Sequence, residues 1–394
     1  MSHLSSQGRI ALLPDPLDEE QRTLQQSILT FAQRELGHDL DRRDHERDFP
    51  REDWRKCARL GLLGMPIPSA YGGLDVSATT IAAALEGLGY GCPDNGLIFA
   101  LNAQMWACEL PIVHFGTEEQ KRHWLPGLCD GSLIAAHGMT EPESGSDAFA
   151  LRTLATPREG GGWLLNGSKT FVTNAPDSDV FIVFATTDRS LGFAGLCAFV
   201  LERGTPGLEV GSPFSKMGLR TSHLGEVFLN DCEVPPESLL GEPGGGMAIF
   251  NTSMRWERSL ILAAAVGTMR RQLERCIAYA RERVQFGTPI GSFQAVSHPL
   301  AKMRLRLQTS HLMLYRIAAL LDAGTATDLD AAMTKLHLSE ALVKSSLDAL
   351  QIHGGSGYVT ESGLERDVRD ALGSRIYSGT SEMQHNVIAR HLGL

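Results

Sequence analysis

Apolar residues recur at helical spacing through the first third of the chain. In segments such as residues 20–36 and 79–88, apolar side chains lie three and four positions apart, as one buried face of a helix requires. Breaks between these helices are expected where the helix-breaking residues fall, at Pro66, Gly72-Gly73 and Pro93. The pattern predicts a helical first domain that begins near Asp18 and ends near Gly131.

The pattern changes to short strand-like runs after His137. The stretch 162–173 contains Asn166-Gly167, a dipeptide typical of a tight hairpin turn between two strands. Three further β-rich runs follow, separated by Gly, Pro and Asp, at residues 180–186, 195–201 and 227–234. These runs predict a small β barrel or sandwich.

Helical periodicity returns after the three glycines 244–246. Side chains on one face recur at three- and four-residue steps, at Val266, Met269, Leu273 and Ile277. Interruptions are expected at Gly287, Pro289, Pro299 and Gly354-Gly355. We therefore predict a mainly helical α+β fold with a loose arm at residues 1–16, a helical domain at 17–134, a β domain at 135–242 and a helical bundle at 243–394.

Composition narrows the function classes. The 394 residues include 43% hydrophobic residues, enough for a large core, and the formal charge is −10, which disfavours a nucleic-acid or anionic-membrane surface. Seven scattered cysteines and thirteen histidines show neither a C-x-x-C nor an H-E-x-x-H spacing, so we expect no metal site and a reducing compartment. With no basic leader and no window near 20 apolar residues, we expect a cytoplasmic protein with no membrane span.

Several ordered motifs carry a resemblance to a known family. The runs are HGMTEPESGSD at 137–147, FVTN at 171–174, KMGLRTS at 216–222, RVQFG at 283–287 with FQ at 293–294, QIHGGSG at 351–357 and RIYSGTSEMQ at 375–384. Together they resemble the acyl-CoA dehydrogenases from about residue 18 to the end. The resemblance implies two helical domains around a β domain, a homotetramer, and FAD bound without a G-x-G-x-x-G fingerprint, which this chain lacks.

The resemblance also implies where FAD would lie. Residues of the first two motifs would line or lie against the flavin: Met139, Thr140, Ser146, Phe171 and Thr173. Residues of the later motifs would reach the cofactor of a neighbouring subunit or its dinucleotide half: Arg283, Gln285, Phe286, Gln351, Gly354, Gly355 and Thr380. Each of these residues also has an ordinary structural role open to it, such as a turn hydroxyl, a core ring, a solvated charge or a helix cap.

The chemistry of the family requires a carboxylate that removes the α proton of an acyl thioester while flavin N5 accepts the β hydride. Most relatives carry that carboxylate after the loop tyrosine, where this chain has Ser378 after Tyr377. In the isovaleryl-CoA and long-chain branches the glutamate comes from a bundle helix, and this chain has Glu257 directly before Arg258. The resemblance therefore implies Glu257 as the base. Glu382, the other carboxylate in the loop region, is expected to have a structural role, because an acid at the start of the final helix interacts favourably with the helix dipole and can cap free N–H groups.

Neighbours of the base receive supporting roles. The backbone N–H of Ser378 is expected to bind the thioester carbonyl, and Arg258 to orient the loop or tune Glu257. Trp256 and Tyr377 are expected at the substrate pocket, where Trp256 would favour short or branched acyl groups.

Three readings of the function stay open at this point. The first is an FAD-dependent dehydrogenase of a short or branched acyl-CoA, which passes electrons to an electron-transfer flavoprotein. The second is a dehydrogenase or oxidase of an acyl or prolyl group tethered to a phosphopantetheinyl carrier protein, with O2 as the acceptor in the oxidase case. The third, of another class, is a catalytically silent flavin-binding assembly protein; a colourless purified protein would favour it.

Overall fold

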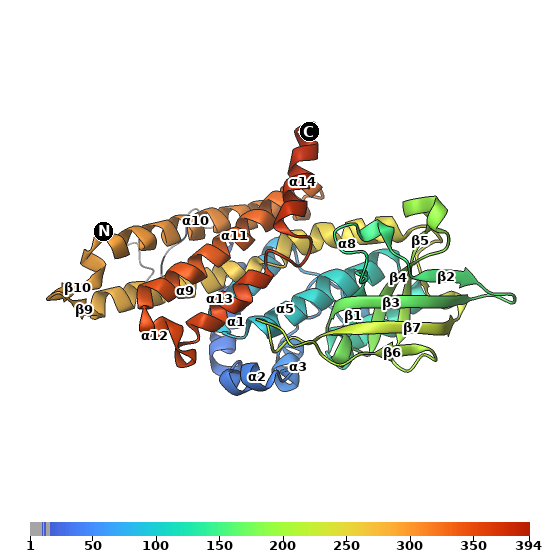
Figure 1. Cartoon of the computed structure of the whole chain (residues 1–394), viewed down its shortest axis with the longest axis horizontal. Coiled ribbons are helices and arrows are strands. Elements are labelled where there is room, and N and C mark those ends of the chain that lie inside the picture. The colour runs from blue at the N-terminus through green and yellow to red at the C-terminus, as the bar shows by residue number, and fades with distance from the viewer. Residues whose placement is uncertain (1–9, 11, 13–15) are drawn as a thin grey trace.

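Helices, a β-sheet and helices again follow one another along the chain (Figure 1). The computed structural model describes residue 10, residue 12 and residues 16–394. The first helices are α1 (Glu19–Glu35), α2 (Leu40–Glu46), α3 (Arg51–Arg59), α4 (Ala78–Gly91), α5 (Asn95–Gln104), the π-helical turn η2 (Met105–Glu109), α6 (Leu110–Phe115) and α7 (Glu118–Cys129).

The start of the described chain is packed more tightly than the sequence suggests. Asp18 caps α1 through a capping box with Gln21. Ile10 and Leu12 are buried in the helical core, and the Ile10 N–H donates to Glu274 Oε1 at 2.7 Å. The expected loose arm is therefore wrong for these two residues, because their apolar side chains reach the core; residues 1–9, 11 and 13–15 lie outside the described residues.

One long apolar run crosses the first domain. Asn95–Phe115, which comprises α5, η2 and α6, is long and apolar enough to cross a membrane by length and composition, with a mean hydropathy of 1.3. This corrects the expectation that no such window exists. Because 83% of that window is buried inside the fold, it has the burial of a core helix.

The middle of the chain forms one eight-stranded sheet in the order β6-β7-β3-β2-β4-β5-β8, with β1 parallel to β4. The strands are β1 (Ala135–Gly138), β2 (Leu154–Pro157), β3 (Trp163–Thr173), β4 (Val180–Thr186), β5 (Leu196–Glu202), β6 (Leu208–Val210), β7 (Leu224–Val234) and β8 (Leu239–Leu240). Successive residues of β4 supply two different apolar clusters, with Ile182 and Phe184 in one and Phe181 and Val183 in the other. Both faces of this strand are therefore buried.

The predicted hairpin at Asn166-Gly167 is wrong. Both residues lie inside β3, where the register against β7 shifts between Leu165 and Gly167. Gly167 has φ 151°, and a Cβ there would meet Thr153 Oγ1 at 2.5 Å, so the glycine serves a close approach to the neighbouring chain. The Asn166 amide is held by Asp231, with Nδ2 donating to Oδ1 at 3.0 Å.

The last part of the chain is helical and shares its core with the first part. Its elements are α8 (Gly246–Leu260), α9 (Ala263–Glu282), the hairpin β9 (Val284–Gln285) and β10 (Thr288–Pro289), α10 (Gln294–Asp322), α11 (Asp328–His353), α12 (Gly355–Tyr358), α13 (Leu364–Gly373) and α14 (Ser381–His391). Helices α4 and α9 cross in close contact, since a Cβ on Gly89 would meet the Ala264 carbonyl oxygen at 1.9 Å. Pro299 does not interrupt the bundle as expected: it lies in the second turn of α10, where it costs a single helical hydrogen bond.

Candidate active site

Glu257 and Ser378 meet although 121 positions separate them in the sequence. Helix α8 presents Glu257 in its last turn, and Ser378 follows α13 in the segment that leads to α14. The Ser378 hydroxyl donates a hydrogen bond to Glu257 Oε1 at 2.5 Å. The carboxylate predicted on the bundle helix therefore touches the small residue that replaces the usual loop glutamate.

Glu257 has the environment of a group whose ionisation is tuned. Its side chain is only 8% exposed, and burial raises the pKa of the carboxyl above its ordinary value. The Ser378 hydrogen bond acts in the opposite direction, as do the positive charges of Arg258 and Lys335. A carboxylate whose pKa is raised in this way is a better proton acceptor than a solvated glutamate.

The loop that carries Ser378 is held by its main-chain carbonyl oxygens. Arg258 Nε donates to the Ser378 carbonyl at 3.2 Å, and Gln384 Nε2 and Lys335 Nζ donate to the Gly379 carbonyl at 2.8 and 2.7 Å. The Ser378 backbone lies in the left-handed region with φ 58°, which a residue with a Cβ adopts only when its surroundings impose it. Arg258 thus contacts the loop, as its predicted orienting role requires.

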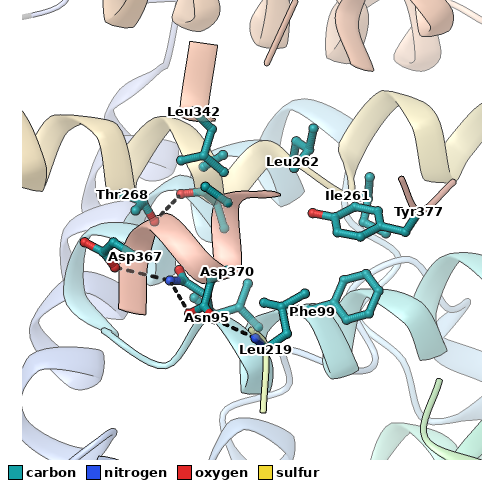
Figure 2. A pocket seen from close by; sticks show the side chains of 14 residues that line it. Asn95, Phe99, Leu219, Ile261, Leu262, Thr268, Leu342, Asp367, Asp370 and Tyr377 are labelled. Atoms are coloured by element: carbon teal, nitrogen blue, oxygen red, sulfur yellow. Dashed lines mark hydrogen bonds between the residues drawn. The ribbon is translucent and has the colours of Figure 1, made fainter. Parts of the chain in front are cut away.

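Tyr377 closes one side of a small cavity. Its ring packs against Phe99 with centroids 4.5 Å apart, and both rings lie at one end of the cavity in Figure 2. Asp370 also lines the cavity; burial raises its pKa to about 7, and the Leu219 N–H donates to its carboxylate at 2.6 Å. The cavity encloses about 40 Å³, room for a few water molecules.

Trp256 contacts core side chains. It stacks on Trp106 with centroids 6.2 Å apart and ring planes 15° from parallel, and it is not among the residues that line this cavity. Its expected effect on acyl-group size stays a prediction.

The residues expected near the flavin lie where β1 ends and β3 passes beside it. Thr140 accepts a hydrogen bond from the Thr170 N–H at 2.9 Å, which ties the loop after β1 to β3. A buried ion pair fixes the same loop, with Lys169 Nζ 2.6 Å from Glu141 Oε1. Met139 is buried, Thr173 is half-buried, and Ser146 is exposed in the following turn.

A second group of expected cofactor residues lies at the far end of the molecule. Arg283, Gln285 and Phe286 belong to the β9–β10 hairpin and its approach, which projects at the opposite end from the β-sheet (Figure 1). Three further residues are exposed around the junction of two helices: Gln351 in the last turn of α11, Gly354 between α11 and α12, and Gly355 at the start of α12. One copy of the chain does not bring these residues to Phe171, so their predicted role requires a second copy. Thr380 accepts the Met383 N–H at 3.3 Å as the N-cap of α14, and a role at the cofactor stays a prediction.

Two exposed phenylalanines and an unexplained glycine indicate what the single chain leaves uncovered. Phe171 is 63% exposed with φ 54°, and Phe286 is 96% exposed with φ 51°. Gly355 has an ordinary φ, and a Cβ on it would meet nothing within 4 Å, so packing within the chain does not require glycine there. Exposed rings and open glycine backbone fit contact with a large planar ligand and a second subunit, which are what FAD and an oligomer would supply.

The comparison with protein families settles the family of the chain. Models of the acyl-CoA dehydrogenases match three consecutive parts: the N-terminal domain at residues 18–132, the middle domain at 136–232 and the C-terminal domain at 244–393. The chain belongs to the acyl-CoA dehydrogenase family. The predicted helix, β and helix fold of this family and the predicted enzyme class, a dehydrogenase that acts on a CH–CH bond of an acyl thioester, are confirmed.

Characterised members of the acyl-CoA dehydrogenase family resemble the chain over nearly its whole length. The L-prolyl-[peptidyl-carrier protein] dehydrogenase of Pseudomonas fluorescens is 45% identical over 351 residues, 89% of this chain and 92% of that protein. The Serratia sp. enzyme of the same name is 42% identical and covers 96% and 98%. The human mitochondrial short-chain specific acyl-CoA dehydrogenase is 39% identical and covers 95% and 90%.

Solved structures of family members superpose closely on this chain. The prolyl acyl carrier protein oxidase AnaB superposes with a TM-score of 0.94 at 50% identity, covering 96% of this chain and 100% of that one. PigA with FAD and proline superposes with a TM-score of 0.94 at 41% identity, covering 97% and 100%. The predicted cofactor is thus present in a relative of the same fold.

Sequence reasoning missed two residues of the site, Lys335 and Gln384. Both are fully buried, and both reach the Ser378–Gly379 segment from helices that the sequence places far from Glu257. The available signal was a lysine among apolar positions of α11, since Ala331, Ala332 and Leu338 are buried on the same helix.

Proposed function

We propose that the chain is an FAD-dependent dehydrogenase of a prolyl group held as a thioester on a peptidyl-carrier protein. The observation that carries the proposal is the 45% and 42% identity to two L-prolyl-[peptidyl-carrier protein] dehydrogenases, together with 50% identity to AnaB. The acyl-CoA reading has a weaker but specific basis in the 39% identity to the short-chain enzyme.

The site is compatible with a compact acyl group. Behind Tyr377 the protein leaves only about 40 Å³, and Phe99 packs on the tyrosine ring. A long acyl chain would have to displace these rings, whereas a five-membered ring does not need that depth. The size of this cavity does not separate the two proposed substrates, so the carrier and the ring are distinguished by experiment.

The proposed reaction removes a proton from Cα and a hydride from Cβ of the thioester. FAD, when bound against Phe171 and Thr173, supplies the acceptor for the hydride. Glu257 takes the Cα proton, and its raised pKa brings the basicity of the carboxylate closer to that of the carbon acid. The Ser378 N–H donates to the thioester oxygen as negative charge develops there.

Ser378 has two roles in this proposal because its two donors are used separately. The hydroxyl is engaged by Glu257 and favours the ionised form of the base before substrate arrives. The backbone N–H does not depend on the side chain, so it serves a chain that has lost the usual glutamate at this position.

The test is the anaerobic visible spectrum of the FAD-loaded protein. We expect L-prolyl-carrier protein to bleach the flavin band within seconds, and prolyl-CoA, butyryl-CoA and isovaleryl-CoA to bleach it at least about tenfold more slowly. Faster bleaching by an acyl-CoA would replace the carrier-bound prolyl substrate with that thioester. Bleaching by none of the four would reject the proposed reaction.

The electron acceptor and the assembly are part of the proposal. We infer an oligomer because Arg283 and Phe286 are exposed at the end of the molecule that lies away from the β-sheet, and the family resemblance favours a homotetramer. We place the enzyme in the cytoplasm, with an electron-transfer flavoprotein or O2 as the acceptor. Oxygen consumption during turnover, measured with and without that flavoprotein, distinguishes the two acceptors.

A further inference from the structure

Lys335 is a buried cation beside the candidate base. It lies on the inner face of α11, with no part of its surface exposed, and its Nζ donates to the Gly379 carbonyl at 2.7 Å. Removing an ammonium group from water is costly unless the protein compensates it. A buried lysine at this position therefore needs a role that a neutral side chain of the same size could not perform.

Three helices converge on two consecutive peptide units. Arg258 of α8 donates to the Ser378 carbonyl, Lys335 of α11 donates to the Gly379 carbonyl, and Gln384 of α14 donates to both. These segments lie next to one another at the top of the bundle in Figure 1. Lys335 is the central donor, because α11 packs against both α8 and α14.

The backbone of the Ser378–Gly379 segment is strained at Ser378. Ser378 and Gly379 both have positive φ values, 58° and 85°. A serine in this region costs of order 1 kcal/mol and persists only where contacts impose it. Loss of one of the three donors therefore allows the Ser378 peptide to rotate, and that rotation moves both its N–H and its hydroxyl.

The charged groups that act on Lys335 come from α8, from α14 and from its own helix. Glu257 and Arg258 face it from α8, Glu340 from its own helix and Glu382 from α14. The Tyr377 ring lies 5.9 Å from Nζ. Burial is the main cause that lowers the pKa of the ammonium group, to about 8; Arg258 lowers it further and the three carboxylates oppose this.

We propose that Lys335 is a positioning residue for the reaction proposed above, whose charged ammonium group holds the Ser378–Gly379 turn so that Ser378 stays aligned with Glu257 and with the thioester. The inference rests on the proposed function for its effect on rate, and on the structure alone for its effect on the loop. A charged donor makes about twice as strong a hydrogen bond as a neutral one, so the hold weakens when Lys335 loses its proton.

Hydrogen exchange tests the effect on the loop without substrate. The Tyr377 N–H donates to the Gly373 carbonyl and the Ser381 N–H donates to the Arg375 carbonyl, so amides on both sides of the turn are protected. In Lys335→Met we expect exchange in a peptide covering residues 376–381 to be at least about tenfold faster, with unchanged exchange in β4. Lys344→Met, an exposed lysine on the same helix, is the matched control and should leave the loop unchanged.

The rate of flavin bleaching tests the effect on the reaction, with whichever thioester reduces the parent. We expect Lys335→Met to lower kcat about 10- to 100-fold with KM changed less than threefold, as for other residues that orient a reacting group. The parent rate should fall on the alkaline side near pH 8, and Lys335→Arg, which stays charged, should recover part of the rate and lose that alkaline fall.

The exchange and bleaching measurements distinguish a failure of the positioning role from a failure of the proposed function. Unchanged exchange in Lys335→Met overturns the positioning role, whatever the substrate. Faster exchange with an unchanged rate also overturns it, because the loop then moves without consequence for the reaction. If no thioester reduces the parent, the proposed function fails, and the exchange result alone decides whether Lys335 holds the loop.

Discussion

The hydroxyl of Ser378 offers the sharpest test of how the base is tuned. Ser378→Gly removes the hydroxyl that donates to Glu257 and keeps the backbone N–H that is proposed to bind the thioester. Glycine also accepts the positive φ of this position without strain, so the change isolates the hydrogen bond.

The magnitude follows from the strength of that bond. A hydrogen bond to an ionised group contributes about 1.5–3 kcal/mol, and it favours the carboxylate over the carboxylic acid. Because 1.36 kcal/mol corresponds to one pH unit, its loss should move the acid limb of the pH profile upward by about one to two pH units. The limb moves to higher pH because the pKa of the Glu257 carboxyl, already raised by burial, rises further when the donor is removed.

Stopped-flow bleaching of the flavin under anaerobic conditions, followed from pH 5 to pH 10, measures this limb. At high pH the variant should react within about threefold of the parent, since the base is then ionised in both. Ser381→Ala is the control, because that hydroxyl donates to Glu340 at 3.1 Å and not to Glu257. An acid limb that stays in place, or moves to lower pH, would refute the tuning argument.

Three further changes test other parts of the structure. Phe99→Ala, which removes the ring packed on Tyr377 at one end of the cavity, should raise kcat/KM for a hexanoyl relative to a prolyl thioester at least about tenfold, and an unchanged ratio would show that the ring does not limit acyl length. Glu109→Gln should make thermal stability less dependent on pH: burial raises the pKa of Glu109 to about 8, so the parent keeps the benefit of the neutral acid below about pH 4.5 and loses it as the pH rises through about 8, and equal changes in Tm between pH 6 and 9.5 in both proteins would contradict this. Arg283→Ala should lower the ratio of flavin to protein in the purified enzyme and weaken assembly measured by light scattering, whereas Arg281→Ala should not; full occupancy in Arg283→Ala would argue against a role across subunits.

Sequence patterns predicted the order of helices, sheet and helices because each depends on local periodicity. The period of the apolar residues changes near His137 and again after Gly246, and the structure changes type at the same places. The pairing of Glu257 with Ser378 was also accessible, since a missing carboxylate in one motif could be matched with a present one in another.

Local rules failed where contacts distant in sequence decide the conformation. Asn166-Gly167 has the composition of a turn, yet pairing with β7 and the approach of Thr153 make it a bulge within β3. The contacts of Lys335 and Gln384 could not be derived for the same reason: a lysine among apolar positions signals a buried cation, but no spacing in the sequence indicates that α11 and α14 meet at one carbonyl group. The residues around Arg283 could not be connected to Phe171 from the sequence, because the β9–β10 hairpin projects away from the β-sheet that carries Phe171.

The central claim is that Glu257 is the base, and the most direct measurement is anaerobic bleaching of the flavin in Glu257→Gln by the thioester that reduces the parent. An amide keeps the shape of the side chain and cannot take a proton, so we expect normal FAD content and a bleaching rate lower by about 10²- to 10⁴-fold. Glu382→Gln, which changes the other carboxylate near the loop, should bleach like the parent. A Glu257→Gln variant that bleaches within threefold of the parent, or a Glu382→Gln variant that does not bleach, would contradict the assignment.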